Sequence, residues 1–326
     1  MTIPYGRRAR DLTWLVALGA GLWGTDALFR NSLAQQVSAQ TLVFAEHLVL
    51  VLVMLPFLPR SLRAFGRLTG TGRRAVVAIG AGASAVATTL FTMAFKISSA
   101  GGDFVTPVVV QHLQPLFAIA GAVFLLGERV RTRFAVFAVP GVLGVWLLAF
   151  PNPFDVTISR LSVVLLALAA AILCAGGTVL GRMLAVELDP VELTTLRFAF
   201  GLPAAALLVW VSGGSFWVPT LGSTGAVIGL ALVPGLLAMV LYYTGLRRTA
   251  ASRATLAELT YPMTGAIVGI ALGSGGTGIL TTSQWVGAAA IVAAVSALSW
   301  HEARARVQAV AAAPLSADSL PASVLR

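Results

Sequence analysis

Ten apolar runs divide this sequence, and each of them is long enough to cross a lipid bilayer as an α-helix. Charged residues make up only 10% of the chain and hydrophobic residues 58%, so a soluble protein of this composition could not cover its surface. Backbone polar groups have no water partners in lipid, and runs of this length satisfy them as helices. We therefore predict an all-α integral membrane protein with ten transmembrane helices, at residues 12–29, 39–58, 75–95, 104–126, 134–150, 161–181, 193–212, 224–246, 255–273 and 284–300.

The basic residues predict how these helices are oriented. If the N-terminus is inside the cell, 18 of the 22 basic residues fall in inner segments, and only Arg30, Lys96 and Arg160 fall in outer ones. Cytoplasmic loops of membrane proteins carry such an excess of arginine and lysine. We therefore expect both termini in the cytoplasm of a bacterial inner membrane. The lipid bilayer is therefore the expected partner. The position of the basic residues on its inner side explains the net charge of +10 without a nucleic-acid partner.

The two halves of the chain repeat one another. Pro115 and Pro262 lie 147 residues apart, and Gly141 and Gly287 lie 146 residues apart. Each half would hold five spans, and an odd number of spans inverts the second copy relative to the first. The expected organisation is two inverted five-helix repeats, arranged as a cytoplasmic segment 1–11, a first repeat 12–150, an external linker 151–160, a second repeat 161–300 and a disordered cytoplasmic tail 301–326.

Each repeat places a proline beside polar residues inside an apolar span. Proline has no N–H group, so Pro115 is predicted to free the carbonyl of Gln111, and Pro262 that of Glu258. A free carbonyl in the membrane needs water, a ligand or a neighbouring donor. Transporters built from inverted repeats hold their substrate where the repeats meet, so these two points are predicted to face one internal site.

Polar and ionisable side chains within the spans are the candidates for contact with a solute, because burying them in lipid is costly. Trp23 and the spans' tyrosines add aromatic surface for stacking. The candidates for solute binding are Trp23, Glu46, Gln111, His112, Gln114, Tyr242, Tyr243, Glu258 and Tyr261. The candidates for gating or ion pairing are Asp26, Arg30 and Arg197.

Several of these residues also have a structural interpretation. Asp26 and Arg30 are spaced i,i+4, which suits a local ion pair as well as a solute contact. Gln111 and Gln114 lie one turn apart, where bonds between helices explain them equally well. Arg197 and Glu258 are expected near the inner edge as a buried ion pair. Glu46 and Gln111 are expected nearer the outer edge, in a second polar cluster, and Glu46 has no basic neighbour on its own helix.

Other classes of function find less support in the sequence. Three histidines and one cysteine offer no metal site, and the glycine-rich stretches 70–73 and 275–278 lack the Gly-Lys-Ser/Thr of a nucleotide loop. No catalytic residue or cofactor is therefore predicted, and transport should be secondary. The alternatives are a membrane-embedded enzyme or a channel acting on a small solute or lipid. The enzyme lacks paired carboxylates for a metal–diphosphate, and an inverted duplication is untypical of a channel.

The sequence resembles the EamA-type transporters of the drug/metabolite transporter superfamily over roughly residues 12–300. The resemblance rests on Leu22-Trp23-Gly24, on Gln111 to Pro115 followed by Leu126 to Arg129, on Gly141, and on their counterparts Tyr242 to Leu246, Ala257 to Leu259, Pro262 and Gln284 to Gly287. Two positions depart from the pattern: Glu46-His47 stands where an arginine like Arg197 is expected, and Ser274-Gly275 stands where the first repeat has Glu128.

This resemblance implies transport of small organic solutes by alternating access. The expected cargo is an amino-acid-like or drug-like metabolite that the protein exports or exchanges. A carboxyl group shielded from water, at Glu46 or Glu258, is the candidate carrier of protons as coupling ion.

Overall fold

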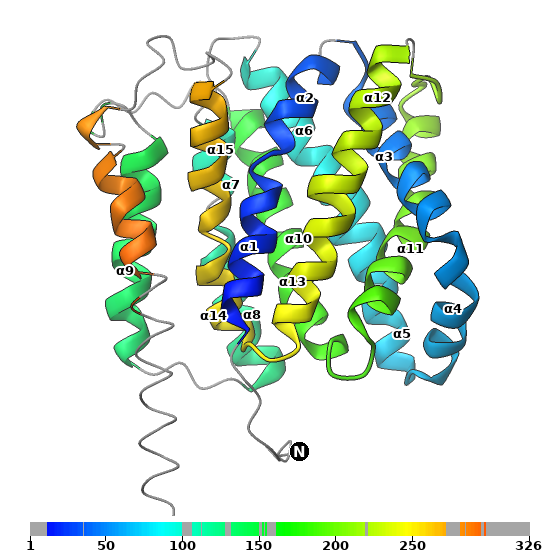
Figure 1. The fold of residues 1–326 in the computed structure, drawn as a ribbon, viewed down its shortest axis with the longest axis horizontal. Helices are drawn as coiled ribbons and strands as arrows, with labels where there is room; N and C mark the ends of the chain where they lie inside the picture. The colour runs from blue at the N-terminus through cyan, green and yellow to red at the C-terminus, as the bar shows by residue number, and fades with distance from the viewer. Residues whose placement is uncertain are drawn as a thin grey trace, which may run out of the picture.

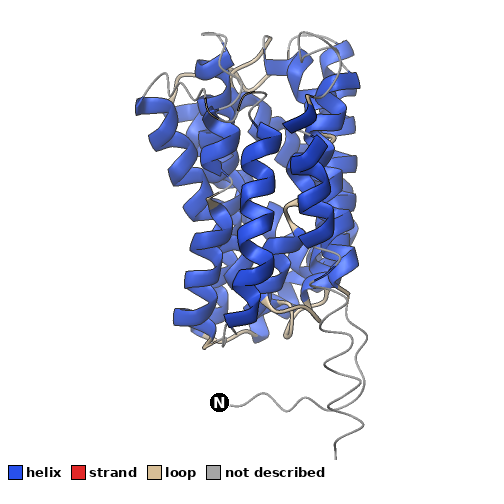
Figure 2. Ribbon diagram, turned by 90° about the vertical axis from the view of Figure 1, so that its left-hand side faces the viewer, coloured by secondary structure: helices blue, strands red, loops and turns tan. Residues whose placement is uncertain are grey.

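The structure is a computed structural model of the 326-residue chain. It describes residues 12–34, 36–99, 106–111, 113–127, 132–149, 152, 154, 161–218, 221–271, 281–283, 285–294 and 297. Within these residues every regular element is a helix, and long helices run side by side along one axis (Figures 1 and 2). The predicted segments 1–11 and 301–326 lie outside the described residues, and only Asn152 and Phe154 of the predicted linker 151–160 are described.

Among the residues that the structure describes, five helical runs are long and apolar enough to cross a membrane by themselves. They are Ala39–Arg67, Gly70–Ser98, Leu161–Leu184, Pro190–Val211 and Gly222–Leu246. The first contains α3 (Ala39–Met54), η1 (Leu55–Phe57) and α4 (Leu58–Arg67), and the third and fourth are α10 (Leu161–Leu184) and α11 (Pro190–Val211). Shorter apolar helices include Gln114–Leu126 and Trp285–Ala294. The first two runs extend well beyond the predicted spans 39–58 and 75–95, because their basic ends continue the helix.

Both prolines singled out in the sequence lie where a helix is interrupted. α7 (Thr106–Gln111) ends before α8 (Gln114–Leu126), which has Pro115 in its first turn, where no N–H is needed. α14 (Ala251–Ala257) ends before α15 (Thr260–Ala271), which contains Pro262. The prediction that the Glu258 carbonyl is left free is wrong, because the N–H of Tyr261 donates to it over 3.0 Å. The chain closes this gap with a local turn.

A third interruption has no proline. α1 (Thr13–Trp23) and α2 (Asp26–Ala34) are separated by Gly24 and Thr25. A Cβ atom at Gly24 would lie 2.6 Å from the backbone nitrogen of Gly265 and 2.8 Å from the carbonyl oxygen of Tyr261. Only glycine therefore permits this close crossing of the first span with α15, and the crossing brings the start of α2 beside the second repeat.

Two π-helical segments widen the helices that face the centre of the bundle. η2 (Ala78–Val86) joins α5 (Gly70–Val77) to α6 (Ala87–Ser99), and η3 (Ala231–Leu237) joins α12 (Leu221–Leu230) to α13 (Ala238–Leu246). They fall in the third helix of each predicted repeat. Such segments often mark functional sites, and here they bring Ser84 and Pro234 to an internal cavity.

A large cluster of buried apolar side chains includes the end of the bundle where α1 begins. Tyr243 and Leu246 on α13 and Leu184 on α10 are fully buried there. Gly19 and Gly245 allow α1 and α13 to cross closely, since a Cβ at Gly19 would lie 2.7 Å from the carbonyl oxygen of Ala238. The remaining described helix of the first repeat, α9 (Thr132–Ala149), packs against α15 and α7.

Candidate functional site

A cavity of about 220 Å³ lies in the middle of the bundle and is lined by both halves of the chain. The first half of the chain lines it with residues of α1, α2, α3, η2, α6, α7 and α8. The second half lines it with residues of α10, α11, η3, α13, α14 and α15. Ten of the twelve candidate residues line this cavity: Trp23, Asp26, Arg30, Glu46, Gln111, Gln114, Arg197, Tyr242, Glu258 and Tyr261. Of the other two, Tyr243 accepts a hydrogen bond from Arg197 through its hydroxyl group, and His112 lies outside the described residues.

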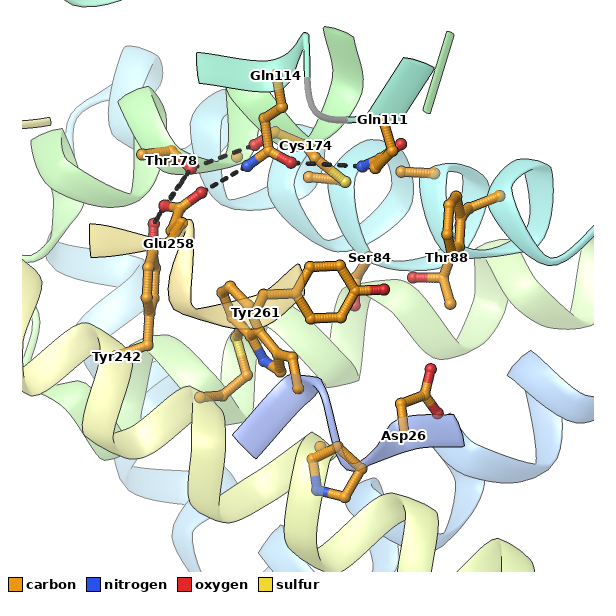
Figure 3. Close-up of a pocket in the computed structure, with 18 of the residues that line it drawn as sticks. Asp26, Ser84, Thr88, Gln111, Gln114, Cys174, Thr178, Tyr242, Glu258 and Tyr261 are labelled. Atoms are coloured by element: carbon orange, nitrogen blue, oxygen red, sulfur yellow. Dashed lines mark hydrogen bonds between the residues drawn. The ribbon is translucent and has the colours of Figure 1, made fainter. Parts of the chain in front are cut away.

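Glu258 lies at the interruption between α14 and α15, where its carboxylate accepts three hydrogen bonds. Tyr242 Oη donates to Oε1 over 2.7 Å, Thr178 Oγ1 to the same oxygen over 3.1 Å, and Gln114 Nε2 to Oε2 over 2.6 Å (Figure 3). The residue is only 7% exposed. All three donors are neutral, so the hydrogen bonds hold the carboxylate without neutralising it.

Gln111 and Gln114 form a polar pair at the interruption of the fourth span. The Nε2 of Gln111, at the end of α7, donates to Oε1 of Gln114, at the start of α8, over 3.3 Å. Gln114 in turn binds Glu258, so the pair links the two repeats. The Oε1 of Gln111 is buried and has no hydrogen-bond partner among the described residues. A buried acceptor without a donor on the wall of a cavity is a place for a donor group of a ligand.

The second group of charges surrounds Arg30 on α2. Its Nε lies 2.7 and 2.9 Å from the two carboxylate oxygens of Asp26, as the i,i+4 spacing predicted. Its Nη2 reaches Oε2 of Glu46 on α3 over 3.4 Å, and its Nη1 donates to Thr92 on α6 over 3.3 Å. Glu46 therefore finds its basic partner on another helix. Asp26 has the most open side chain of the three charged groups, 25% exposed against 12% for Arg30 and 11% for Glu46.

Arg197 occupies a third position, and the predicted ion pair with Glu258 is wrong. Arg197 donates to Tyr243 Oη over 3.0 Å, to Ser84 Oγ over 3.2 Å and to the carbonyl of Ala83 over 3.1 Å. The π-helical segment η2 supplies two of these acceptors, and their position cannot be read from spacing along one helix. The printed partners of Arg197 are thus all neutral groups, as those of Glu258 are.

The predicted separation into an outer and an inner cluster is also wrong. Gln111, from the expected outer group, connects through Gln114 to Glu258, from the inner one. Because the interrupted helices of both repeats end near the middle of the bundle, their polar residues meet in one cavity.

Aromatic side chains fill the space between these polar groups. The rings of Trp23 and Tyr242 lie 5.0 Å apart and are tilted by 44°. Tyr261 points into the cavity between the Glu258 group and Asp26 (Figure 3). Rings of this kind offer flat apolar surface with a polar edge, which suits an organic solute with both characters.

Some cavity residues were not among the sequence candidates. Thr178 binds Glu258, Ser84 accepts from Arg197, and Thr92 accepts from Arg30. Hydroxyl groups in apolar helices commonly donate to the backbone of their own helix, as Thr92 also does to the carbonyl of Thr88. A serine or threonine in a span therefore does not by itself indicate a functional site. His47 is 2% exposed and lies between the carbonyl of Val43 and Ser84 Oγ.

Comparison with known proteins identifies both halves of the chain. The model of the EamA-like transporter family matches residues 12–150 and again residues 161–300. The riboflavin transporter ImpX of Fusobacterium nucleatum is 26% identical over 264 residues, which cover 78% of this chain and 86% of that protein. A solved crystal structure has the same fold, with a TM-score of 0.70 and 21% identity over 89% of this chain and 99% of its own. The chain therefore belongs to the EamA-like transporter family and is a multi-pass membrane protein that transports small solutes.

Proposed function

We propose that this protein is a secondary transporter that moves small organic metabolites across the bacterial inner membrane by alternating access. In this proposal ten spans form two inverted repeats with both termini in the cytoplasm. The observation that carries it is the cavity, where the interrupted helices of both repeats present Gln111, Gln114, Glu258 and Tyr261 to one space. Transporters made of inverted repeats bind their substrates at such an interface.

The packing around the cavity supports access of the solute from one side of the membrane in this structure. Tyr243 and Leu246 are fully buried where α1 begins, whereas Asp26 at the start of α2 keeps a quarter of its side chain exposed. With the N-terminus in the cytoplasm, the cavity then opens toward the external side. Alternating access requires the opposite arrangement as well, in which the Arg30 group closes and the crossing of α1 with α13 opens.

The charges of the cavity support an amino-acid-like or similarly polar solute. Glu258 and Arg197 carry opposite charges, and each is surrounded by neutral partners. A zwitterion would place its ammonium group at Glu258 and its carboxylate at Arg197. Riboflavin is a second solute to test, because a relative is a riboflavin transporter and the aromatic walls suit a flat ring system.

The direction that we propose is export or exchange, and protons are the coupling ion. A proton is a small cation that Glu258 or Glu46 can accept while the solute is elsewhere in the cycle. Alternating access would then move solute and proton through one cavity at different times. An imposed pH gradient across a proteoliposome membrane tests this coupling, since solute flux should follow the gradient.

Transport by purified protein in proteoliposomes tests the function itself. Gln111→Leu and Gln114→Leu should each weaken solute binding by about 1–2 kcal/mol, the scale of one lost buried hydrogen bond, while the protein still folds. Gln40→Leu is the matched control, because Gln40 also lies within a span but bonds Met93 and does not line the cavity. Saturable uptake of amino-acid-like solutes or riboflavin is the expected readout.

Two results would count against this proposal. Electrical recording that shows an unsaturable current would indicate a channel instead of a carrier. Wild-type transport by both glutamine variants, folded to normal levels, would show that the stretch around Pro115 only packs, and would remove the site from this cavity.

A further inference from the structure

The hairpin formed by α4 and α5 extends past the membrane's apolar layer. The helical runs Ala39–Arg67 and Gly70–Ser98 contain 29 residues each. At about 1.5 Å per residue each run is about 43 Å long, whereas the hydrocarbon core of a bilayer is about 30 Å thick. Since both runs meet at residues 68 and 69, α4 and α5 end together at one end of the bundle (Figure 1). This end therefore reaches the level of the lipid head groups.

Besides Arg60, four arginines are exposed on this hairpin, and we call these four the basic hairpin: Arg63, Arg67, Arg73 and Arg74. The Nη2 of Arg73 donates to the carbonyl of Gly66 over 2.6 Å, which brings α5's arginines beside those of α4. Arg63 and Arg74 each donate from Nε to the carbonyl four residues back, over 3.3 Å. Among the residues that the structure describes, none of the four pairs with a carboxylate.

The nearest acids on the neighbouring helix are already engaged. Arg60 binds Glu192 over 2.9 Å and also binds Asp189. The same two acids form the capping box of α11: the N–H of Glu192 donates to Asp189 Oδ1 over 3.4 Å, and the N–H of Asp189 donates to Glu192 Oε2 over 3.1 Å. This contact fixes the hairpin against α11. It leaves the four arginines exposed and without a carboxylate partner among the described residues, so an anion from outside the chain can bind them.

Apolar side chains continue the exposed face from the arginines toward the membrane centre. On α4 and the turn before it, Leu55 is 52% exposed and lies in an i,i+4 row with Pro59, Arg63 and Arg67. On α5, Val77 is 42% exposed and lies one turn from Arg73. A ligand of this face therefore needs an anionic head at one end and an apolar chain at the other.

We propose that the basic hairpin binds the phosphate head groups of anionic phospholipids of the surrounding membrane. The guanidinium groups contact the phosphate, and the acyl chains lie along Leu55 and Val77. Clusters of four or more basic residues at the end of a transmembrane helix attract anionic lipids, and arginine matches phosphate geometry with paired N–H donors. This site is separate from the transport cavity and does not depend on the solute.

Native mass spectrometry of the purified, delipidated full-length protein tests this site. Phosphatidylglycerol and phosphatidylcholine with identical acyl chains are added in turn, and the fraction of protein that retains lipid is measured. The wild type should retain phosphatidylglycerol at least about tenfold better, and this preference should fall as sodium chloride screens the charges.

The variant carries Arg63→Gln, Arg67→Gln and Arg74→Gln together. It keeps Arg73 and Arg60, which hold the hairpin, so that folding is preserved. The control removes the same number of charges elsewhere, with Arg182→Gln, Arg247→Gln and Arg248→Gln. The variant should lose the preference for phosphatidylglycerol, and the control should retain it.

Three results would overturn the proposal. In the first, the wild type binds both lipids equally at low salt. This result would overturn the proposal even if the variant does not fold. Another is a variant that keeps the full preference. The third is inorganic phosphate that raises the unfolding temperature as much as phosphatidylglycerol does at the same concentration, which would indicate a free anion as the ligand.

Discussion

Glu258 and Arg197 face one cavity, yet each binds its own neutral partners. Residues without a shared contact or network contribute nearly additively to stability, within about 0.5 kcal/mol. We therefore expect the effects of Arg197→Gln and Glu258→Gln on the free energy of unfolding to add in the double variant. Chemical unfolding of the purified single and double variants measures this. Recovery of stability in the double variant would restore the direct ion pair that the sequence suggested.

Arg30 has two acidic neighbours, and its geometry ranks them. Asp26 contacts Nε with both oxygens at 2.7 and 2.9 Å, whereas Glu46 reaches Nη2 at 3.4 Å. Since short charge-assisted bonds are the stronger ones, Asp26→Asn should cost about 2 kcal/mol and Glu46→Gln about 1 kcal/mol or less. Thermal unfolding should show this order, and Glu187→Gln, at an exposed position, is the control. A larger loss for Glu46→Gln would contradict it.

At the scale of the helices, the interruption before Pro115 is the element that we expect to matter for turnover. Pro115→Ala restores an N–H at the start of α8, which allows the helix to continue back toward α7. The polar pair at Gln111 and Gln114 stays in place, so solute affinity should change less than twofold while the transport rate falls several-fold.

The control for this change is Pro140→Ala. Pro140 also lies inside a helix, α9, but does not line the cavity. Transport rate and solute affinity are measured on both variants in proteoliposomes. If Pro115→Ala and Pro140→Ala behave alike, the interruption of the fourth span has no special part in the cycle.

Sequence patterns predicted those elements whose cause is local. Pro115 and Pro262 indicate two of the interruptions because a missing N–H acts within one turn, and the spacing of Asp26 and Arg30 gives their contact directly. The interruption at Gly24 was missed, since its cause is the crossing with α15, more than two hundred residues away in the sequence. The π-helical segments η2 and η3 were also missed.

The same distinction holds for the site. Polar side chains within apolar spans could be identified from the sequence, because each needs a partner away from lipid. Ten of these twelve candidate residues line the cavity. Their partners were less predictable: Gln114 and Glu258 are 144 positions apart, and Glu46 meets Arg30 across two helices. Such pairings depend on how each helix is rotated about its axis, which spacing within one helix does not determine.

For the whole molecule, the distribution of basic residues predicts that the loop between α11 and α12 is external. A cysteine placed at Ser215, in a Cys174→Ser background, should react with a membrane-impermeant thiol reagent in intact cells. A second cysteine at Thr277, outside the described residues, should react in the same way. The same distribution places the basic hairpin on the cytoplasmic side. Labelling that requires cell lysis would reverse both assignments.

Cys174 has a consequence of its own. It is the single cysteine of the chain, it lines the cavity, and it is neither fully buried nor fully open. The natural protein therefore carries a thiol group whose reactivity depends on water access to the transport cavity. A small mercurial would attach to this sulfur only while water reaches it, and a bound solute would slow the attachment. The rate of thiol modification would thus time the opening and closing of the molecule without any engineered label.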